Sequence, residues 1–311
     1  MPKSERNKTI TLTKEETQRL LDRCVLSRAL NDETDLTDKI VCGDAFDIAP
    51  RLQKNAYDLM IIDPPYNLTK NYGGEKFYKT NAGEYAAFTE RWIRAFYPAL
   101  KPTASVYVCC DFMSGVTIAP ILAKYFTIRS RITWQREKGR GAKNNWKNGM
   151  EDVWFCTVSD DYYFDLGSVK QRRRVLAPYR ENGEPKDWFV ADGEKYRDTC
   201  PSNFWDDVTV PYWSMSENTA HPTQKPEKLV AKLMLASAKK GDFVLDPFAG
   251  SGTTAVVAKK LGRRFTSIER NPGYCALGIA RLDRAETDTT IQGYEDGVFY
   301  ARGERPKPRN R

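Results

Sequence analysis

Histidine is nearly absent from this chain of 311 residues, because His221 is the only one. A single histidine excludes zinc sites with two histidine ligands and the H-E-x-x-H motif of metalloproteases, so we expect no bound metal. A Ser-His-Asp triad would also depend on His221, but no G-x-S-x-G motif accompanies it.

The chain also lacks long apolar runs and regular cysteine spacing. No apolar stretch approaches the roughly 20 residues that a membrane-spanning helix requires, and no secretory signal is visible in the polar, basic residues 1–9. The seven cysteines are scattered, odd in number and free of C-x-x-C spacing. They predict reduced, mostly buried thiols in a cytoplasmic protein without a membrane partner.

Positive charge, in contrast, is abundant. The formal net charge of +8 at pH 7 indicates a polyanionic partner. The length allows one large α/β domain with a substantial insert.

The most informative motif is Asp63-Pro64-Pro65-Tyr66, which follows the apolar residues 59–62. The apolar run predicts a buried parallel strand that ends at the prolines, and ligands of open α/β sheets bind at such strand ends. The exocyclic amine of a nucleobase could donate one hydrogen to Asp63 and the other to a proline carbonyl, while Tyr66 stacks on the ring. On these four residues alone, a strand end followed by a capping Asp63 remains an equal alternative.

A second motif, at residues 243–255, predicts a strand, a glycine turn and the start of a helix. It fits the G-x-G-x-x-A pattern of dinucleotide-binding folds, so a nicotinamide dehydrogenase and a plain tight turn are both alternatives. Asp246 would repel a pyrophosphate but would favour a ligand with a positively charged end. S-adenosylmethionine (SAM) has such an end, has a ribose for Glu269, and supplies an electrophilic methyl group.

The order of these motifs resembles that of the β-class DNA amino-methyltransferases of bacteria and phages. The resemblance covers roughly residues 38–285, and the matching segments are Gly43-Asp44-Ala45, Asp63-Pro64-Pro65-Tyr66, a basic insert, His221-Pro222-Thr223-Gln224-Lys225-Pro226, residues 246–252 and Glu269. It implies a circularly permuted Rossmann-like fold of the SAM-dependent methyltransferases, in which the catalytic half precedes the cofactor half.

The resemblance also implies roles for individual residues. Asp44 would accept a hydrogen bond from the cofactor adenine, Glu269 would hold the ribose, and His221, Thr223 and Lys225 would lie near the methionine carboxylate. The full cofactor set is Asp44, Ala45, Asp63, His221, Thr223, Lys225, Asp246, Phe248, Gly250, Ser251, Gly252 and Glu269, and the catalytic set is Asp63, Pro64, Pro65 and Tyr66. A structural interpretation of the third segment has Thr223 capping a helix, with Pro226 in its first turn.

The fold class that the pattern predicts is a doubly wound α/β fold with a mostly parallel, seven-stranded sheet. The expected strands are residues 40–42, 59–62, 105–110, 126–134, 153–158, 243–246 and 265–269. The expected helices are residues 14–27, 84–100, 116–124, one after 226, 253–261 and one to about 284. We expect an N-terminal accessory arm (1–38), a catalytic half (39–160), an inserted target-recognition region (161–218), a SAM-binding half (219–285) and a basic C-terminal tail (286–311), disordered from 301.

Two basic segments are candidates for DNA contact, namely a mobile loop at residues 136–149 and a cluster in the insert. A solvated basic face is the alternative for the cluster, and Trp146 would be either a stacking residue or a buried anchor. The candidate residues are Arg136, Lys138, Arg140, Lys143, Lys147, Lys170, Arg172, Arg173 and Arg174.

The sequence therefore predicts a site-specific, nucleoid-associated enzyme that transfers a methyl group from SAM to N6 of a flipped adenine in double-stranded DNA. Cytosine-N4 methylation is an alternative, although that group more often carries serine in place of Asp63. A catalytically silent DNA-binding subunit is another. Many members of the class form homodimers or act beside a restriction endonuclease, and the resemblance leaves both partners open.

Overall fold

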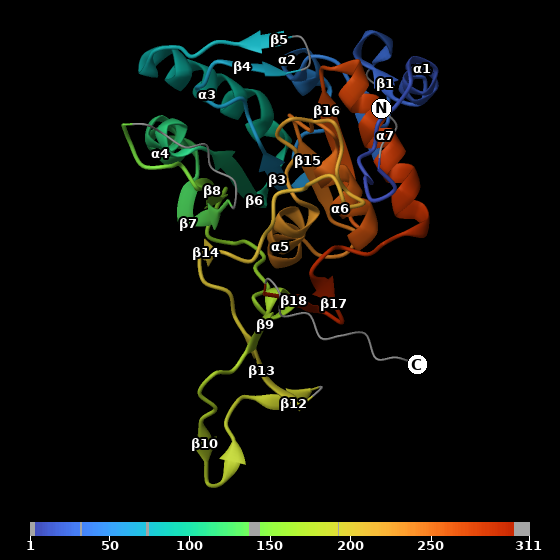
Figure 1. Cartoon of the computed structure of the whole chain (residues 1–311). Coiled ribbons are helices and arrows are strands. Elements are labelled where there is room, and N and C mark those ends of the chain that lie inside the picture. Colours follow the sequence, from blue (N-terminus) through green and yellow to red (C-terminus); the bar gives the residue numbers. More distant parts are fainter. Residues whose placement is uncertain (1–3, 32, 73–74, 137–143, 192, 302–311) are drawn as a thin grey trace.

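The computed structural model describes residues 4–31, 33–72, 75–136, 144–191 and 193–301 (Figure 1). Its central strands are β1 (Val25–Leu26), β2 (Lys39–Cys42), β3 (Tyr57–Ile62), β6 (Leu100–Cys110), β7 (Thr127–Gln135), β8 (Met150–Thr157), β14 (Phe204–Trp205), β15 (Phe243–Asp246) and β16 (Arg264–Glu269). The α-helices in these residues are α1 (Lys14–Leu21), α2 (Ala45–Ile48), α3 (Ala82–Phe96), α4 (Phe112–Tyr125), α5 (Glu227–Ser237), α6 (Thr253–Leu261) and α7 (Pro272–Thr287).

The strands form one nine-stranded sheet in the order β1-β2-β16-β15-β3-β6-β8-β7-β14. Adjacent strands are parallel from β1 to β6, and β14 is parallel to β7, whereas β8 runs antiparallel to both of its neighbours. Seven of these strands were predicted. The other two, β1 and β14, are two-residue edge strands, which are too short to show an alternating pattern.

Helices cover both faces of the sheet, which confirms the doubly wound α/β class (Figure 1). Along β3, Leu59 and Ile61 pack into the core shared with α5, α6 and α7, while Met60 and Ile62 pack into the core shared with α2, α3 and α4. All four side chains are buried. A strand that is apolar on both sides belongs in the centre of a parallel sheet, and this position places Asp63 at the middle of its carboxyl edge.

Two helices differ from their predicted bounds for local reasons. A capping box between Asn81 and Glu84 starts α3 two residues earlier than expected, and Leu100 begins β6 instead of ending the helix. The helix predicted at residues 14–27 ends at Leu21, and Val25 then pairs with Val41 of β2.

The N-terminal segment, which was predicted as an accessory arm or helix, contains helix α1 and packs on the body of the protein. Helix α1 lies against α7, where Arg23 and Asp283 form an ion pair at 2.7 Å. Ile10 forms a parallel bridge with Thr219, in the stretch that leads to the 221–226 segment. No α-helix in the described part of the chain is long and apolar enough to cross a membrane.

A second, five-stranded sheet protrudes from the body (Figure 1). It has the order β12-β13-β9-β18-β17, and a separate two-stranded hairpin extends from it. Its strands are β9 (Gln171–Arg174), β12 (Phe189–Ala191), β13 (Glu194–Thr199), β17 (Tyr294–Glu295) and β18 (Val298–Tyr300), and the hairpin strands are β10 (Arg180–Glu181) and β11 (Glu184–Pro185).

The C-terminal segment completes this sheet, so the predicted tail at 286–311 is wrong for residues 294–300. Strand β18 runs parallel to β9, with Phe299 opposite Gln171, and both side chains are buried. Helix α7 also extends two residues past the predicted boundary at 285. Residues 302–311, the rest of the predicted tail, lie outside the described residues.

Candidate active site

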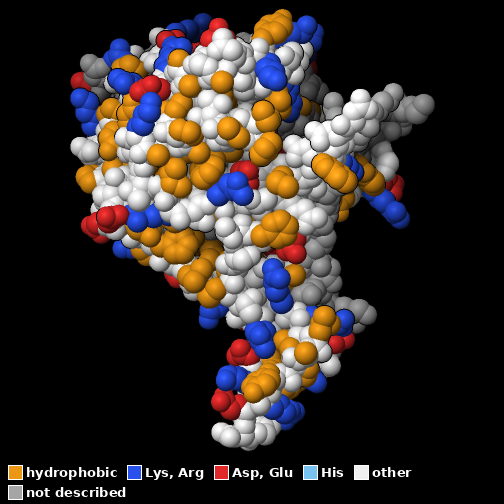
Figure 2. All heavy atoms as spheres, turned by 90° about the vertical axis from the view of Figure 1, so that its left-hand side faces the viewer, with side chains coloured by type: hydrophobic (Ala, Val, Ile, Leu, Met, Phe, Trp, Pro, Cys, Tyr) orange, Lys and Arg blue, Asp and Glu red, His pale blue; other side chains and the backbone are white. Residues whose placement is uncertain are grey.

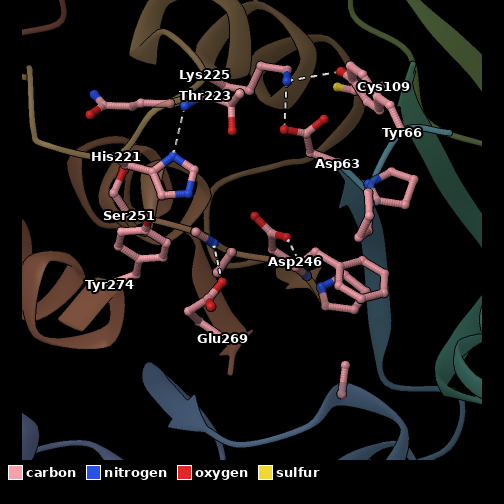
Figure 3. Close-up of a pocket in the computed structure, with 18 of the residues that line it drawn as sticks. Asp63, Tyr66, Cys109, His221, Thr223, Lys225, Asp246, Ser251, Glu269 and Tyr274 are labelled. Atoms are coloured by element: carbon pink, nitrogen blue, oxygen red, sulfur yellow. Dashed lines mark hydrogen bonds and ion pairs between the residues drawn. The ribbon is translucent and has the colours of Figure 1, made fainter. Parts of the chain in front are cut away.

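A cavity of about 470 Å³ opens at the carboxyl ends of the central parallel strands. Its lining comes from both halves of the domain, and includes residues 43–46, 63–66 and 246–251. Figure 3 shows Lys225, Asp63 and Tyr66 together above Asp246. His221 lies to the left of this group, and Glu269 lies below it. This position and volume are typical of a small-molecule site in an open α/β sheet.

The Asp63 carboxylate has one occupied and one open oxygen. Its Oδ2 atom accepts a hydrogen bond from Lys225 Nζ at 2.6 Å, and the same ammonium donates to the Tyr66 hydroxyl at 3.1 Å (Figure 3). Oδ1 is buried and has no hydrogen-bond partner within the described residues. A buried acceptor without a donor is costly, so this oxygen is suited to receive a hydrogen from a ligand.

Hydrogen bonds from neighbouring segments fix the turn that carries Asp63. The Tyr85 hydroxyl donates to the Pro65 carbonyl at 3.0 Å, and Asn67 N donates to Ser114 Oγ at 2.9 Å. Asn67 also exchanges hydrogen bonds with the backbone of Thr80 at 2.8 and 3.0 Å. Because the fold already uses the Pro65 carbonyl, Pro64 is the better candidate for the second acceptor.

Glu151, at the start of β8, belongs to this site although no motif identified it. Its Oε2 atom lies 3.4 Å from the Tyr66 hydroxyl and 3.5 Å from Lys225 Nζ, and Oε1 accepts from Arg136 Nη1 at 2.5 Å. Buried acids are rare unless they are paired. The sequence signal that could have indicated Glu151 is its position in a pair of acids directly before the apolar run at 153–158.

The turn between β15 and α6 depends on two glycines with left-handed backbone angles. Gly250 has φ +54°, and a Cβ atom there would lie 2.9 Å from His221 Nε2. Gly252 has φ +75°, and a Cβ atom there would lie 3.0 Å from the Cα of Gly278 in α7. The glycines therefore allow His221 and α7 to approach the turn closely.

Two carboxylates flank this turn, that of the buried Asp246 and that of the partly buried Glu269. Asp246 accepts from Phe248 N at 3.1 Å, and burial raises its pKa to about 7. Glu269 accepts from Gly250 N at 2.9 Å and from Asn271 N at 2.7 Å, and burial raises its pKa as well. A ligand with a positively charged end would relieve the desolvation of Asp246, as the sequence predicted for a sulfonium or an α-ammonium group.

At the other end of the cavity, Asp44 caps α2 by accepting from Phe46 N at 2.8 Å. Ala45 lies beside it in the lining, and the rings of Phe46 and Phe248 meet edge to face with centroids 6.5 Å apart. A capping carboxylate beside two aromatic rings fits a flat, amine-bearing ring. The cavity thus has suitable groups for the adenine, ribose and methionine parts of SAM.

The 221–226 segment is arranged differently from the helix-cap interpretation, which is wrong. Helix α5 begins at Glu227, whose N–H donates to Glu217 Oε2 at 2.8 Å, so Thr223 does not cap it. Thr223 N instead donates to His221 Nδ1 at 3.3 Å. The imidazole and the ring of Tyr274 meet edge to face, with their centroids 4.4 Å apart. Burial lowers the pKa of His221 to about 4.

The partly buried imidazole makes protein stability depend on pH. The pKa of His221 is about 4 in the fold and 6.5 when unperturbed, so the unfolded chain binds more protons between these values. Stability should therefore fall as pH drops from about 6.5 to about 4, by a total of roughly 3 kcal/mol from this group. NMR can check the cause, because the single histidine should show no titration between pH 8 and about 5 when folded. Titration near pH 6.5 in the folded protein would contradict it.

Lys225 lines the cavity, as predicted for a cofactor residue. Its ammonium, however, pairs with the Asp63 carboxylate and does not face the space where a cofactor carboxylate would lie. Ser251 is a buried residue that lines the cavity, and Arg281 Nη1 donates to its carbonyl at 3.0 Å. The predicted cofactor residues His221, Thr223, Asp246, Phe248 and Gly250 line the cavity as well.

The candidate DNA contacts are divided by the structure. Arg136 lines the cavity and pairs with Glu151. Lys147 is exposed in residues 144–149, which we call the rim loop. Trp146 is 93% exposed, so its interpretation as a buried anchor is wrong. Lys138, Arg140 and Lys143 lie outside the described residues.

The arginines of the insert are paired with acids. Arg172 donates to both carboxylate oxygens of Asp198 at 2.8 Å, and Arg174 pairs with Glu194. Arg173 lies 3.7 Å from Asp206, while Lys170 is exposed. Figure 2 shows basic, acidic and hydrophobic side chains interspersed on the protruding part, which is not a uniform basic face.

Comparison with known proteins identifies the family. A family model described as DNA methylase matches residues 57–280. Type II methyltransferase M.HpaI of Haemophilus parainfluenzae is 33% identical over 253 residues, which cover 79% of this chain and 74% of that protein. DNA adenine methyltransferase YhdJ of Escherichia coli is 35% identical over 258 residues, which cover 79% of this chain and 83% of that protein.

Solved structures share the fold. The M1.HpyAVI–SAM complex has a TM-score of 0.52 at 24% identity and covers 78% of this chain and 98% of its own. The cytosine-N4-specific PvuII DNA methyltransferase has a TM-score of 0.59 at 17% identity, with coverages of 80% and 90%. The chain therefore belongs to the DNA methylase family whose members methylate exocyclic N6 or N4 amino groups, and it is a SAM-dependent DNA methyltransferase.

Proposed function

We propose that this protein transfers a methyl group to N6 of a flipped adenine in double-stranded DNA. The observation that carries the proposal is Asp63 Oδ1, a buried acceptor without a partner in the described residues, at the carboxyl edge of the sheet. An amine hydrogen would satisfy it. The similarity to a relative named as a DNA adenine methyltransferase supports adenine as the base.

The proposed reaction depends mainly on orientation and electrostatics. When bound, SAM supplies the electrophilic methyl group. Asp44 would hold its adenine, Glu269 its ribose, and Asp246 with residues 248–252 its methionine end. Asp63 Oδ1 and the Pro64 carbonyl would accept the two amine hydrogens, which turns the nitrogen lone pair out of conjugation with the ring. With a pKa of about 4, His221 is a poor base, so we expect the proton to leave after methyl transfer.

We further propose that the flipped base stacks on Tyr66, and that the rim loop and the protruding sheet engage the duplex. The rim loop follows β7, which ends at the same edge of the sheet as β3, and exposes Trp146 and Lys147 there. Base flipping costs a few kcal/mol, which stacking on Tyr66 would partly offset. Lys170 directly precedes β9 and is exposed, as are Arg173 and Arg174, which pair with acids. We therefore expect Lys170 to contact phosphate before the paired arginines do.

Replacing Lys147 with alanine should weaken DNA binding at every sequence and reduce the slope of log Kd against log salt by about one. The reason is the loss of one phosphate contact. Fluorescence anisotropy over a series of salt concentrations measures both quantities. Lys240→Ala is the matched control, because Lys240 is exposed near the amino end of β15, away from the site. An unchanged slope in Lys147→Ala would remove this residue from the interface.

An enzyme that modifies chromosomal DNA has to bind it, so we propose that the protein is associated with the nucleoid. A homodimer and a cognate restriction endonuclease remain predictions from the resemblance. Size-exclusion chromatography with light scattering would test the first of these.

The decisive experiment is to incubate the protein with SAM and genomic DNA, and to identify the modified nucleoside by mass spectrometry. We expect N6-methyladenine, and sequencing of modified sites then gives the recognition sequence. N4-methylcytosine would reject adenine as the target. Binding of SAM and DNA without any methylated product would contradict the proposed reaction.

A further inference from the structure

We propose that Lys225 is a positioning residue for the catalytic carboxylate, and that its ammonium orients Asp63 so that Oδ1 faces the target amine. This inference rests on the proposed function. It differs from the role that the resemblance implies, in which Lys225 lies near the methionine carboxylate of the cofactor.

The contacts of the ammonium leave little capacity for a ligand. An ammonium has three hydrogens, and three acceptors surround Lys225 Nζ. They are Asp63 Oδ2 at 2.6 Å, the Tyr66 hydroxyl at 3.1 Å and Glu151 Oε2 at 3.5 Å. The side chain is 11% exposed, so water competes weakly. A cofactor carboxylate would have to displace one of these acceptors.

The contacts also fix the carboxylate in one rotation. With Oδ2 held by the ammonium, Oδ1 is the oxygen that is left for the substrate, and it is the buried atom without a partner in the described residues. A free carboxylate could exchange its two oxygens by rotation about its χ2 bond. The ion pair therefore prepares the acceptor before the base arrives.

Lys225 joins the two halves of the domain as well. Its backbone carbonyl accepts from Thr253 Oγ1 at 3.1 Å, at the first residue of α6 in the cofactor half. Its ammonium reaches Asp63, which lies 162 residues away in sequence and belongs to the catalytic half. One residue thus contacts both the start of α6 in the cofactor half and the acceptor in the catalytic half.

The charge of Lys225 is required because Asp63 and Glu151 are both carboxylates around one buried point. Without the ammonium, the two negative charges would repel each other across that point. The other groups that interact electrostatically with Asp63 come from several elements, and besides Tyr66 and Lys225 they are Lys70, Tyr85, Cys109, His221 and Asp246. Among these groups, Lys225 is the cation that contacts Asp63 Oδ2.

The test compares Lys225→Met with the wild type at saturating SAM and DNA. We expect kcat at pH 7 to fall about 100-fold, since displacement of a reacting group by about 1 Å costs that much. The Kd of SAM, measured by calorimetry, should change less than about threefold.

Lys101→Met is the matched control. Lys101 Nζ also pairs with a carboxylate of β3 at 2.6 Å, that of Asp58, but at the amino end of the strand and away from the cavity. Its kcat should equal that of the wild type.

A large rise in the Kd of SAM with kcat retained would overturn the proposal and assign Lys225 to the cofactor carboxylate. If Lys225→Met does not fold, Lys225→Arg serves instead, since it keeps the charge but not the three-way geometry. It should show a lower kcat with an unchanged Kd of SAM, and a wild-type kcat would overturn the proposal. Failure of the proposed function is seen separately, as the absence of N6-methyladenine from the wild-type reaction.

Discussion

Replacing Asp63 with alanine is expected to reduce methyl transfer by about 100- to 1,000-fold or more, while binding of SAM and DNA persists. The range follows from the loss of one preorganised hydrogen-bonding group that acts on the reacting atom. Asp63 Oδ1 is the acceptor without a partner in the described residues, so alanine removes the group that would orient the amine. Lys225 would still contact Tyr66 and Glu151. The variant therefore keeps the ammonium in the cavity but lacks the acceptor for the amine.

Transfer of a labelled methyl group to a DNA duplex measures the rate, and gel-shift and calorimetric titrations measure the two affinities. The matched control is Asp58→Asn, at the other end of the same strand, where the carboxylate accepts from Lys101 at 2.6 Å and from Phe243 N at 3.0 Å. That variant should lose stability but keep its rate per folded molecule. Near-normal transfer by Asp63→Ala would rule out the catalytic assignment.

Replacing Arg281 with methionine is expected to lower the free energy of unfolding by about 3 kcal/mol, which is the lower end of the cost of breaking a buried ion pair. Arg281 is 2% exposed and lies in α7 behind the glycine turn. It donates to the Ser251 carbonyl at 3.0 Å, to Thr253 Oγ1 at 2.9 Å and to Glu227 Oε1 at 2.9 Å. Lys260 also pairs with Glu227, which moderates the loss.

The same change should weaken SAM binding, because the turn that lines the cavity loses its support from behind. Urea unfolding followed by circular dichroism measures the stability, and calorimetry measures the affinity. Arg284→Met is the control, since Arg284 is an exposed residue of the same helix. An unchanged Kd of SAM in Arg281→Met would confine the role of Arg281 to stability.

The parts of the site that the sequence predicted are those in which a local pattern coincides with a motif. Strand β15 and helix α6 begin and end at the predicted residues, because an apolar run, a glycine turn and a helical pattern follow each other without interruption. The position of Asp63 could be predicted for the same reason, since a fully apolar strand ends at two prolines. These features require no knowledge of distant residues.

The remaining features depend on tertiary contacts. Residues 20–25 carry a helical pattern, yet Val25 pairs with β2, because burial in the sheet outweighs helix propensity there. The resemblance implied that Lys225 lies near the methionine carboxylate of the cofactor, and its contact with Asp63 becomes visible only in the fold. Glu151 was missed because its partners Tyr66, Arg136 and Lys225 lie in three other segments.

The parallel pairing of β18 with β9 has a consequence for exchanging specificity between related enzymes. A transplant of residues 161–218 alone would carry β9, β12 and β13 but leave β17 and β18 of the recipient, whose Phe299 is fully buried in the composite sheet. The hybrid would join a foreign surface to a C-terminal strand that did not evolve with it. A transferable unit therefore has to include residues 294–300 as a second piece.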